Sequence, residues 1–178
     1  MLMASLMSED LQDALSSGPR TAAELQATLG ISQPTLSRLL ATRPAEICRL
    51  GRARATRYAW RRTVHGLAPS QPLYRVTHAG QVVRIGSLQV LQGGFWFDDA
   101  EQPTASQWFD GLPWFLADMS PQGFLGQRFV RQLAGMGLPE GLSDWQDDHA
   151  LVALACRGED ALGNLILGEE SLTRWQET

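Results

Sequence analysis

The chain of 178 residues contains no lysine, and all 15 of its basic residues are arginine. A phosphate-binding P-loop, the phosphate anchor of a protein kinase and a cofactor Schiff base each need a lysine amine. The sequence also shows no cluster of nucleophile, base and orienting residue of the kind that an active site requires. We therefore expect no catalytic activity from this chain.

Cysteine and histidine are also scarce. Two cysteines and three histidines are scattered without metal-ligand spacing: Cys48, His65, His78, His149 and Cys156. This favours reduced thiols, a cytoplasmic protein, and no metal or cofactor. The N-terminus lacks the basic region of a signal peptide, and the longest later apolar stretch, 150–156, is too short to span a bilayer. We expect no contact with a membrane.

Charge is divided unevenly along the chain. Residues 1–63 carry nine arginines against five acids, a net charge of +4, whereas the remainder carries six arginines against fourteen acids, a net charge of -8. The change falls near residues 64–72, a segment with one glycine and two prolines that is typical of a linker. We therefore expect one domain at 1–63, called the head below, and one at 73–178, called the body. The basic head suggests an anion-binding function.

The head has the pattern of three helices followed by two strands. Ser8 is a candidate N-cap for a first helix that reaches about residue 16, and Thr21–Glu24 matches a capping box at the start of a second, which ends near Gly30. Ser32 is a natural N-cap for a third helix, with Pro34 in its first turn. The apolar residues of these helices should share one small core: Leu25, Leu29, Ile31, Leu36, Leu39 and Leu40.

Two groups of polar residues in the head are candidates for DNA binding, because their side chains hydrogen-bond base edges and phosphates. The third helix carries Gln33, Thr35, Ser37 and Arg38. Residues 47–60 then predict two short strands around an arginine-rich tip, a wing, with the candidates Arg52, Arg54, Thr56 and Arg57. Residues 20–62 carry nine arginines against two acids, a net charge of +7, which favours nucleic acid as the partner.

The runs Thr21–Leu25 and Leu29–Leu40 resemble bacterial winged helix-turn-helix DNA-binding domains over about residues 5–62. The glycine of the turn, the helix cap, the leucine spacing and the wing all agree with that pattern. Gln26 departs from it, because this motif often has a small residue there. The resemblance implies a double-stranded DNA operator as a partner of the head.

The body is predicted to join a small antiparallel sheet to helices. Strands are expected at 73–78, at 81–91 with a break at Gly86, and at 95–97, followed by an acidic and polar loop at 98–107. Helical pieces are expected around 112–119, 124–133 and 144–156, and a last strand at 163–167. The predicted fold class of the whole chain is α+β.

Two segments of the body, Phe109–Gly123 and Leu154–Leu165, resemble the N-terminal subdomain of HipA-family serine/threonine kinase toxins. The order of head and body is similar to the YjjJ-type branch of that family. HipA-like toxins carry their ATP-binding loop and catalytic aspartate after this subdomain, so the resemblance implies no catalytic residue in this chain. It also implies a surface that contacts a HipA-like kinase, with the aromatic candidates Trp108, Phe109, Trp114 and Phe115.

From these resemblances we expect an antitoxin: a DNA-binding autorepressor that binds and neutralises a separately encoded HipA-like serine/threonine kinase toxin. Two alternatives stay open. The chain could be the N-terminal regulatory fragment of a longer winged-helix HipA-like kinase, or a winged-helix transcription regulator whose acidic body senses a small molecule. The head could also support a homodimer.

Overall fold

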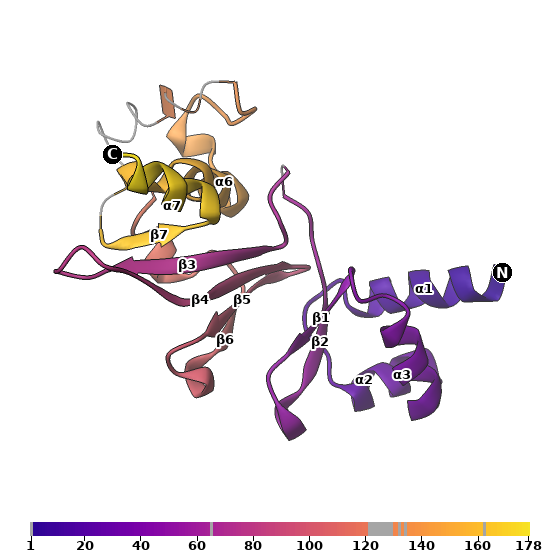
Figure 1. The fold of residues 1–178 in the computed structure, drawn as a ribbon. Helices are drawn as coiled ribbons and strands as arrows, with labels where there is room; N and C mark the ends of the chain where they lie inside the picture. Colours follow the sequence, from indigo (N-terminus) through magenta and orange to yellow (C-terminus); the bar gives the residue numbers. More distant parts are fainter. Residues whose placement is uncertain (1, 65, 121–129, 132, 134, 162) are drawn as a thin grey trace.

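The computed structural model describes residues 2–64, 66–120, 130, 131, 133, 135–161 and 163–178, and the chain is a mixed α+β protein with two antiparallel sheets (Figure 1). The described helices are α1 (Leu2–Ala14), α2 (Ala22–Leu29), α3 (Gln33–Ala41), α4 (Trp114–Ala117), α6 (Asp147–Arg157) and α7 (Glu169–Gln176). The strands are β1 (Ile47–Leu50), β2 (Arg57–Trp60), β3 (Ser70–Val76), β4 (Val82–Leu91), β5 (Gly94–Asp99), β6 (Gln107–Phe109) and β7 (Leu165–Leu167). Short 3-10 helices include η1 (Ala53–Ala55) and η2 (Pro103–Ala105).

Helix α2 begins with the predicted capping box. The hydroxyl of Thr21 accepts a hydrogen bond from the backbone N–H of Glu24 at 3.2 Å, and the Glu24 carboxylate accepts one from the backbone N–H of Thr21 at 2.7 Å. These bonds satisfy two of the amide donors that the start of a helix leaves without partners. The helix ends at Gly30, whose φ of 63° suits glycine, and the tight turn there lets α3 begin at Gln33.

One buried core joins the three helices of the head to its hairpin. Its buried side chains are Leu11, Leu15, Leu25, Leu36, Ile47 and Trp60. Leu29, Ile31, Leu39 and Leu40 are partly buried against them, which confirms the predicted core. Each fully buried leucine contributes roughly 1.5–3 kcal/mol relative to an exposed one, so this small core accounts for much of the stability of the head.

Helix α1 differs from the prediction at its start. It begins at Leu2, so Ser8 lies within the helix and is not its N-cap. The reason is local propensity: residues 2–7 are leucine, methionine, alanine, serine, leucine and methionine, which are mostly strong helix formers. They extend the helix beyond the point that the capping signal indicated.

The sheet of the body has the strand order β6-β5-β4-β3-β7, and every neighbouring pair is antiparallel. This order confirms the predicted meander and the predicted last strand. Strand β6 begins at Gln107, the last residue of the segment 98–107 that was predicted to be a loop. Strand β4 is continuous through Gly86, but its register with β3 shifts at the predicted break, because Leu73 pairs with Gly86 and Tyr74 pairs with Arg84. A Cβ atom at Gly86 would come within 2.5 Å of the carbonyl oxygen of Asp98, so the glycine permits close approach of the neighbouring strand.

Helices α6 and α7 lie over one face of this sheet (Figure 1). The core between them includes Leu73, Leu88 and Phe95 from the strands and Leu151 and Leu154 from α6, all 2% exposed or less. Helix α7 was not predicted, because Ser171 is its one buried residue in the described structure and it shows no apolar stripe. The helix predicted at 124–133 lies mostly outside the described residues.

The head packs directly on the body. The backbone N–H of Arg62 donates to the carbonyl oxygen of Val90 at 3.1 Å, and that of Gln92 donates to the carbonyl oxygen of Trp60 at 2.8 Å. An apolar cluster, called the junction cluster below, consists of Cys48, Leu50, Ala59 and Leu91, with Trp96 and Trp108 packed against it. Strand β3 begins at Ser70, so the last residues of the predicted linker belong to the sheet.

Candidate nucleic-acid interface

Helix α3 exposes three of its four predicted contact residues. Leu36 is 1% exposed in the core of the head and fixes the rotation of the helix about its axis. Gln33, Ser37 and Arg38 are exposed. Because residues four positions apart lie on the same face of a helix, Gln33 and Ser37 are neighbours on the outer surface.

Two side chains of α3 also make contacts near its first turn. The Nε of Arg38 donates to the carbonyl oxygen of Pro34 at 3.2 Å, a contact that orients the guanidinium along the helix. The hydroxyl of Thr35 lies 3.0 Å from that of Ser32, and Thr35 is half-buried. The amide of Gln33, the hydroxyl of Ser37 and the guanidinium of Arg38 are therefore the more accessible hydrogen-bonding groups of this surface.

The tip of the β1–β2 hairpin carries the second predicted group. Gly51, with a φ of 70°, turns the chain out of β1, and η1 closes the tip. Arg52, Arg54 and Arg57 are exposed, and no carboxylate of the described residues forms an ion pair with them. The hydroxyl oxygen of Thr56 is buried and has no hydrogen-bond partner within the described structure. The Thr56 hydroxyl is therefore not accessible for a direct contact with DNA.

Figure 1 shows helix α3 and the hairpin tip in the same lower part of the head, with α2 drawn between them. Both groups of predicted residues belong to the head, one on a helix and one on a hairpin. The helix can offer hydrogen-bond donors to base edges, and the hairpin can offer positive charge to phosphates.

Two arginines of the basic segment point instead to the body. The Nη1 of Arg61 donates to Oε1 of Gln89 at 3.0 Å. Arg62 donates through Nη1 to the carboxylate of Asp148, with which it forms an ion pair, and through Nε to the carbonyl oxygen of Leu91 at 3.2 Å. The ion pair with Asp148 compensates the charge of Arg62, so the sequence count of +7 overstates the charge that the head offers to a partner. No local sequence signal predicts these contacts of Arg61 and Arg62, because their partners in the body lie far away in the sequence.

The aromatic residues predicted as a kinase-contacting surface lie on different faces of the body. Trp108 pairs with Trp96 across β5 and β6, and Phe109 pairs with Phe95. Since successive side chains of a strand point to opposite faces, Trp108 turns toward the head, where it packs against the junction cluster, while Phe109 turns toward the helices. The indole N–H of Trp108 donates to Asp110 at 2.7 Å.

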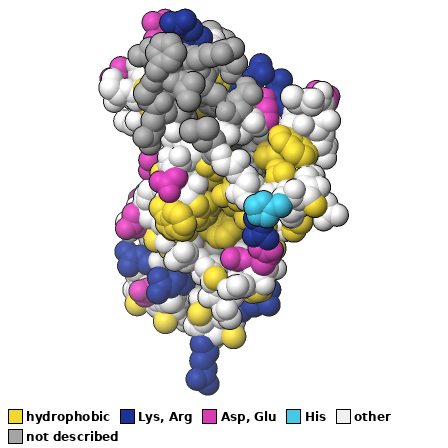
Figure 2. All heavy atoms as spheres, turned by 90° about the vertical axis from the view of Figure 1, so that its left-hand side faces the viewer, with side chains coloured by type: hydrophobic (Ala, Val, Ile, Leu, Met, Phe, Trp, Pro, Cys, Tyr) yellow, Lys and Arg dark blue, Asp and Glu magenta, His cyan; other side chains and the backbone are white. Residues whose placement is uncertain are grey.

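The remaining two aromatic candidates lie at α4. Phe115 packs against the core, with its ring centroid 5.2 Å from that of Phe97 and 6.0 Å from that of Phe109. Trp114 is 67% exposed and is the most accessible of the four predicted residues. Figure 2 shows that hydrophobic side chains also gather around a hollow on the side of the body that faces away from the head.

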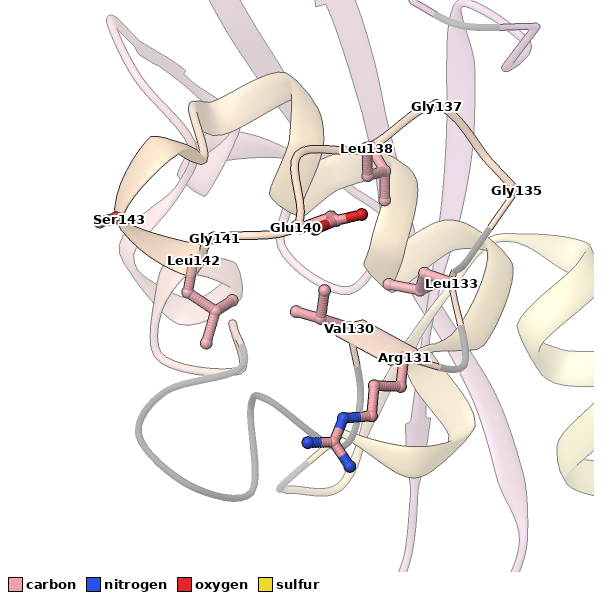
Figure 3. A pocket seen from close by; sticks show the side chains of 10 residues that line it. All are labelled: Val130, Arg131, Leu133, Gly135, Gly137, Leu138, Glu140, Gly141, Leu142 and Ser143. Atoms are coloured by element: carbon pink, nitrogen blue, oxygen red, sulfur yellow. The ribbon is translucent and has the colours of Figure 1, made fainter.

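A hollow of about 930 Å³ lies at the far end of the body, where its described lining runs from Val130 to Ser143 (Figure 3). Its described lining is mostly leucine, valine and glycine, and its two charged side chains, Arg131 and Glu140, point away from each other. Such a lining lacks the convergent polar groups that mark a catalytic site. Within the described residues, no three His, Cys, Asp or Glu side chains gather in a way that could hold a metal ion.

Burial raises the pKa of the thiols of Cys48 and Cys156. A thiol with a raised pKa stays protonated at neutral pH, so neither cysteine is an activated nucleophile. In the described parts of the chain, no helix has both the length and the apolar character needed to cross a bilayer.

Comparison with protein families matches residues 67–176 to the family described as "YjjJ-like toxin, middle domain". The chain is also 41% identical over 169 residues to "Toxin YjjJ" of Escherichia coli (strain K12). That alignment covers 93% of this chain and 37% of the relative, so the chain spans a little over a third of the length of the protein that it matches. No solved structure matches the chain significantly.

These findings correct one prediction and support another. The matched family and the matched relative are both named as toxins, so the prediction that this chain is an antitoxin is wrong. The error arose because the absence of kinase motifs was interpreted as evidence for an inhibitor of a separate kinase. The resemblance to the YjjJ-type branch is confirmed. Because the family match spans more than half of the sequence, the chain belongs to the family of YjjJ-like toxins.

Proposed function

We propose that the head is a winged helix-turn-helix domain that binds double-stranded DNA, and that it provides DNA recognition to a YjjJ-type toxin. The order of elements supports this proposal: α1, an isolated antiparallel bridge between Arg20 and Tyr58, α2, α3, and then the β1–β2 hairpin with its basic tip. In helix-turn-helix domains the helix after the turn enters the major groove. Helix α3 occupies that position here.

The observation that carries the proposal is that the head exposes both the polar surface of α3 and an arginine-rich hairpin tip. Glutamine and arginine are the side chains that pair with adenine and guanine edges, so Gln33 and Arg38 are the proposed base-reading residues. Arg52, Arg54 and Arg57 are the proposed phosphate contacts, because their exposed guanidinium groups have no carboxylate partner among the described residues.

For the body we propose an arrangement like the HipA N-terminal subdomain, which supports the head and takes no direct part in catalysis. The sequence has no lysine, and both thiols are buried with raised pKa values. The alignment covers 37% of Toxin YjjJ, so we do not assign the activity of that longer protein to the residues of this chain.

The experiment is a selection of bound sequences from a random duplex library, followed by fluorescence anisotropy on the selected site. Wild-type protein should enrich a defined sequence. Arg38→Ala should weaken binding to that sequence by roughly 1–3 kcal/mol and relax its specificity. Arg84→Gln, which removes one exposed arginine from the body, is the charge-matched control. Failure of the folded wild-type protein to enrich any sequence would contradict the proposal.

A further inference from the structure

A groove of about 770 Å³ lies between the β1–β2 hairpin and the sheet of the body. The hairpin supplies one wall through residues 48–52 and Ala55, and the body supplies the other through Gln89, Trp96, Asp98 and residues of the loop at 103–106. Its volume lies within the range of sites for small molecules, and such sites occur preferentially where two domains meet. No local sequence signal indicates this groove, because its walls come from distant segments.

The groove is lined by more positive than negative charge. Arg49, Arg52 and Arg61 line it, against the single carboxylate of Asp98. Arg61 is held in place by its hydrogen bond to Gln89 at 3.0 Å. Arg49 and Arg52 are exposed and form no ion pair with any carboxylate of the described residues. Since guanidinium groups bind phosphate oxygens in bidentate fashion, the charges suit a ligand with more than one phosphate.

An aromatic side chain and several polar groups complete the lining. Trp96 is half-buried, and it lies opposite Gln89 on the neighbouring strand, on the same face of the sheet. Its indole can provide a flat apolar surface for a planar ring, while Thr104 and Ser106 add hydroxyl groups. The hydroxyl of Ser106 donates to Asp98 at 3.3 Å, which orients that carboxylate at the wall of the groove.

We propose that this groove binds a nucleotide. The phosphates contact Arg49 and Arg52, and the base packs against the indole of Trp96. A polyanion joined to a flat aromatic ring uses both the arginines and the tryptophan of the lining. The nucleotide binds from solution, and the site is separate from the helix α3 surface.

Arg52 belongs both to the groove and to the proposed phosphate contacts of the hairpin tip. A nucleotide in the groove should therefore compete with DNA for this one side chain, a consequence that rests on the proposed DNA-binding function. Binding of the nucleotide itself does not depend on it. The DNA backbone is a second source of phosphate for the same arginines, and the experiment separates the two.

The experiment is isothermal titration of the full 178-residue chain with ADP, with adenosine and with pyrophosphate. ADP should bind more tightly than either fragment, because it engages both the arginines and the tryptophan. Arg49→Gln should weaken ADP binding by about tenfold or more, the effect of losing one charge-assisted hydrogen bond. Trp96→Leu should weaken ADP and adenosine but leave pyrophosphate unchanged. Circular dichroism of each variant reports whether it is folded.

Arg54→Gln is the matched comparison, because Arg54 lies on the same hairpin outside the groove. It should weaken DNA binding and leave ADP binding unchanged, whereas Arg49→Gln should do the reverse. No ADP binding by folded wild-type protein would overturn the inference. So would equal loss of ADP affinity in Arg49→Gln and Arg54→Gln, or equal affinity for ADP and pyrophosphate. Failure of DNA binding alone would overturn the proposed function and leave the nucleotide site standing.

Discussion

The guanidinium of Arg62 donates a hydrogen bond to the carboxylate of Asp148 and so links the end of the head to the first turn of α6. The side chains of this pair are only 24% and 33% exposed. Arg62 also lies 5.6 Å from the centre of the Phe95 ring, a cation–π contact with the core of the body. The pair therefore joins the head directly to the body.

Loss of this ion pair should loosen the junction. Asp148→Asn leaves Arg62 half-buried without its charged partner, so we expect a loss of about 1–2 kcal/mol in the free energy of unfolding. Hydrogen exchange should also become faster for the amides of Arg62 and Gln92, whose bonds join the two parts. Glu177→Gln removes an exposed carboxylate at the C-terminal end and is the control. Equal protection of the junction amides in wild type and Asp148→Asn would show that the pair does not hold the head.

The capping box at the start of α2 predicts both a stability loss and a pH dependence. Thr21→Ala should destabilise the head by about 1 kcal/mol, a typical cost of losing an N-cap. Hydrogen bonds from Thr21 hold the pKa of Glu24 below its ordinary value of 4.5. A carboxylate with a depressed pKa in the folded state stabilises the protein above its unfolded pKa, and this contribution is lost as the pH falls through the folded value.

The difference in melting temperature between wild type and Glu24→Gln tests this pH dependence. The difference should be constant near neutral pH and should shrink as the pH falls below about 4.5. Exposed Glu9, outside the capping box, gives the control Glu9→Gln. A difference that stays constant down to strongly acidic pH would contradict the assignment.

The raised pKa of Tyr74 leads to a second prediction about pH, a loss of stability at alkaline pH. Burial, together with the hydrogen bond that its hydroxyl donates to Glu169 at 2.6 Å, raises its pKa from 10.0 to about 12. Below pH 10 the phenol is neutral in both states, and between pH 10 and pH 12 the unfolded state loses its proton first. Stability should therefore fall across this range, and Tyr74→Phe should lack this fall.

Ultraviolet absorbance of the phenolate measures this pKa directly. The chain has two tyrosines, so Tyr58→Phe leaves the Tyr74 titration to be read alone. A midpoint near pH 10 in the folded Tyr58→Phe protein would contradict the raised value.

We also predict that the 178-residue chain does not catalyse phosphate transfer. The purified chain incubated with labelled ATP should neither incorporate label nor release phosphate, because it offers no lysine to position a γ-phosphate. Stoichiometric labelling of the chain would contradict this prediction. The binding of a nucleotide in the groove would not, since binding requires no chemical step.

The sequence predicted the elements that depend on local signals. The capping box at Thr21, the turn at Gly30 and the core positions of α2 and α3 follow from hydrogen bonding and periodicity within a few residues. The exposure of Gln33 and Arg38 follows from the same helical spacing.

The features that depend on tertiary contacts were missed. Arg62 was counted as available charge, although its carboxylate partner Asp148 lies in the body. Trp108 and Phe109 were grouped as one surface, although strand alternation separates them once β6 pairs with β5. A sequence without a known strand register does not show on which face each side chain lies.

The salt dependence of DNA binding tests the central claim most directly. The logarithm of the association constant should fall linearly with the logarithm of the salt concentration, and each phosphate contact contributes about 0.9 to the slope. The double variant Arg54→Gln, Arg57→Gln should therefore lower the slope by about 1.8, whereas Arg84→Gln on the body should leave it unchanged. A slope unchanged by the double variant, or lowered equally by Arg84→Gln, would contradict the account of the head as a DNA-binding domain.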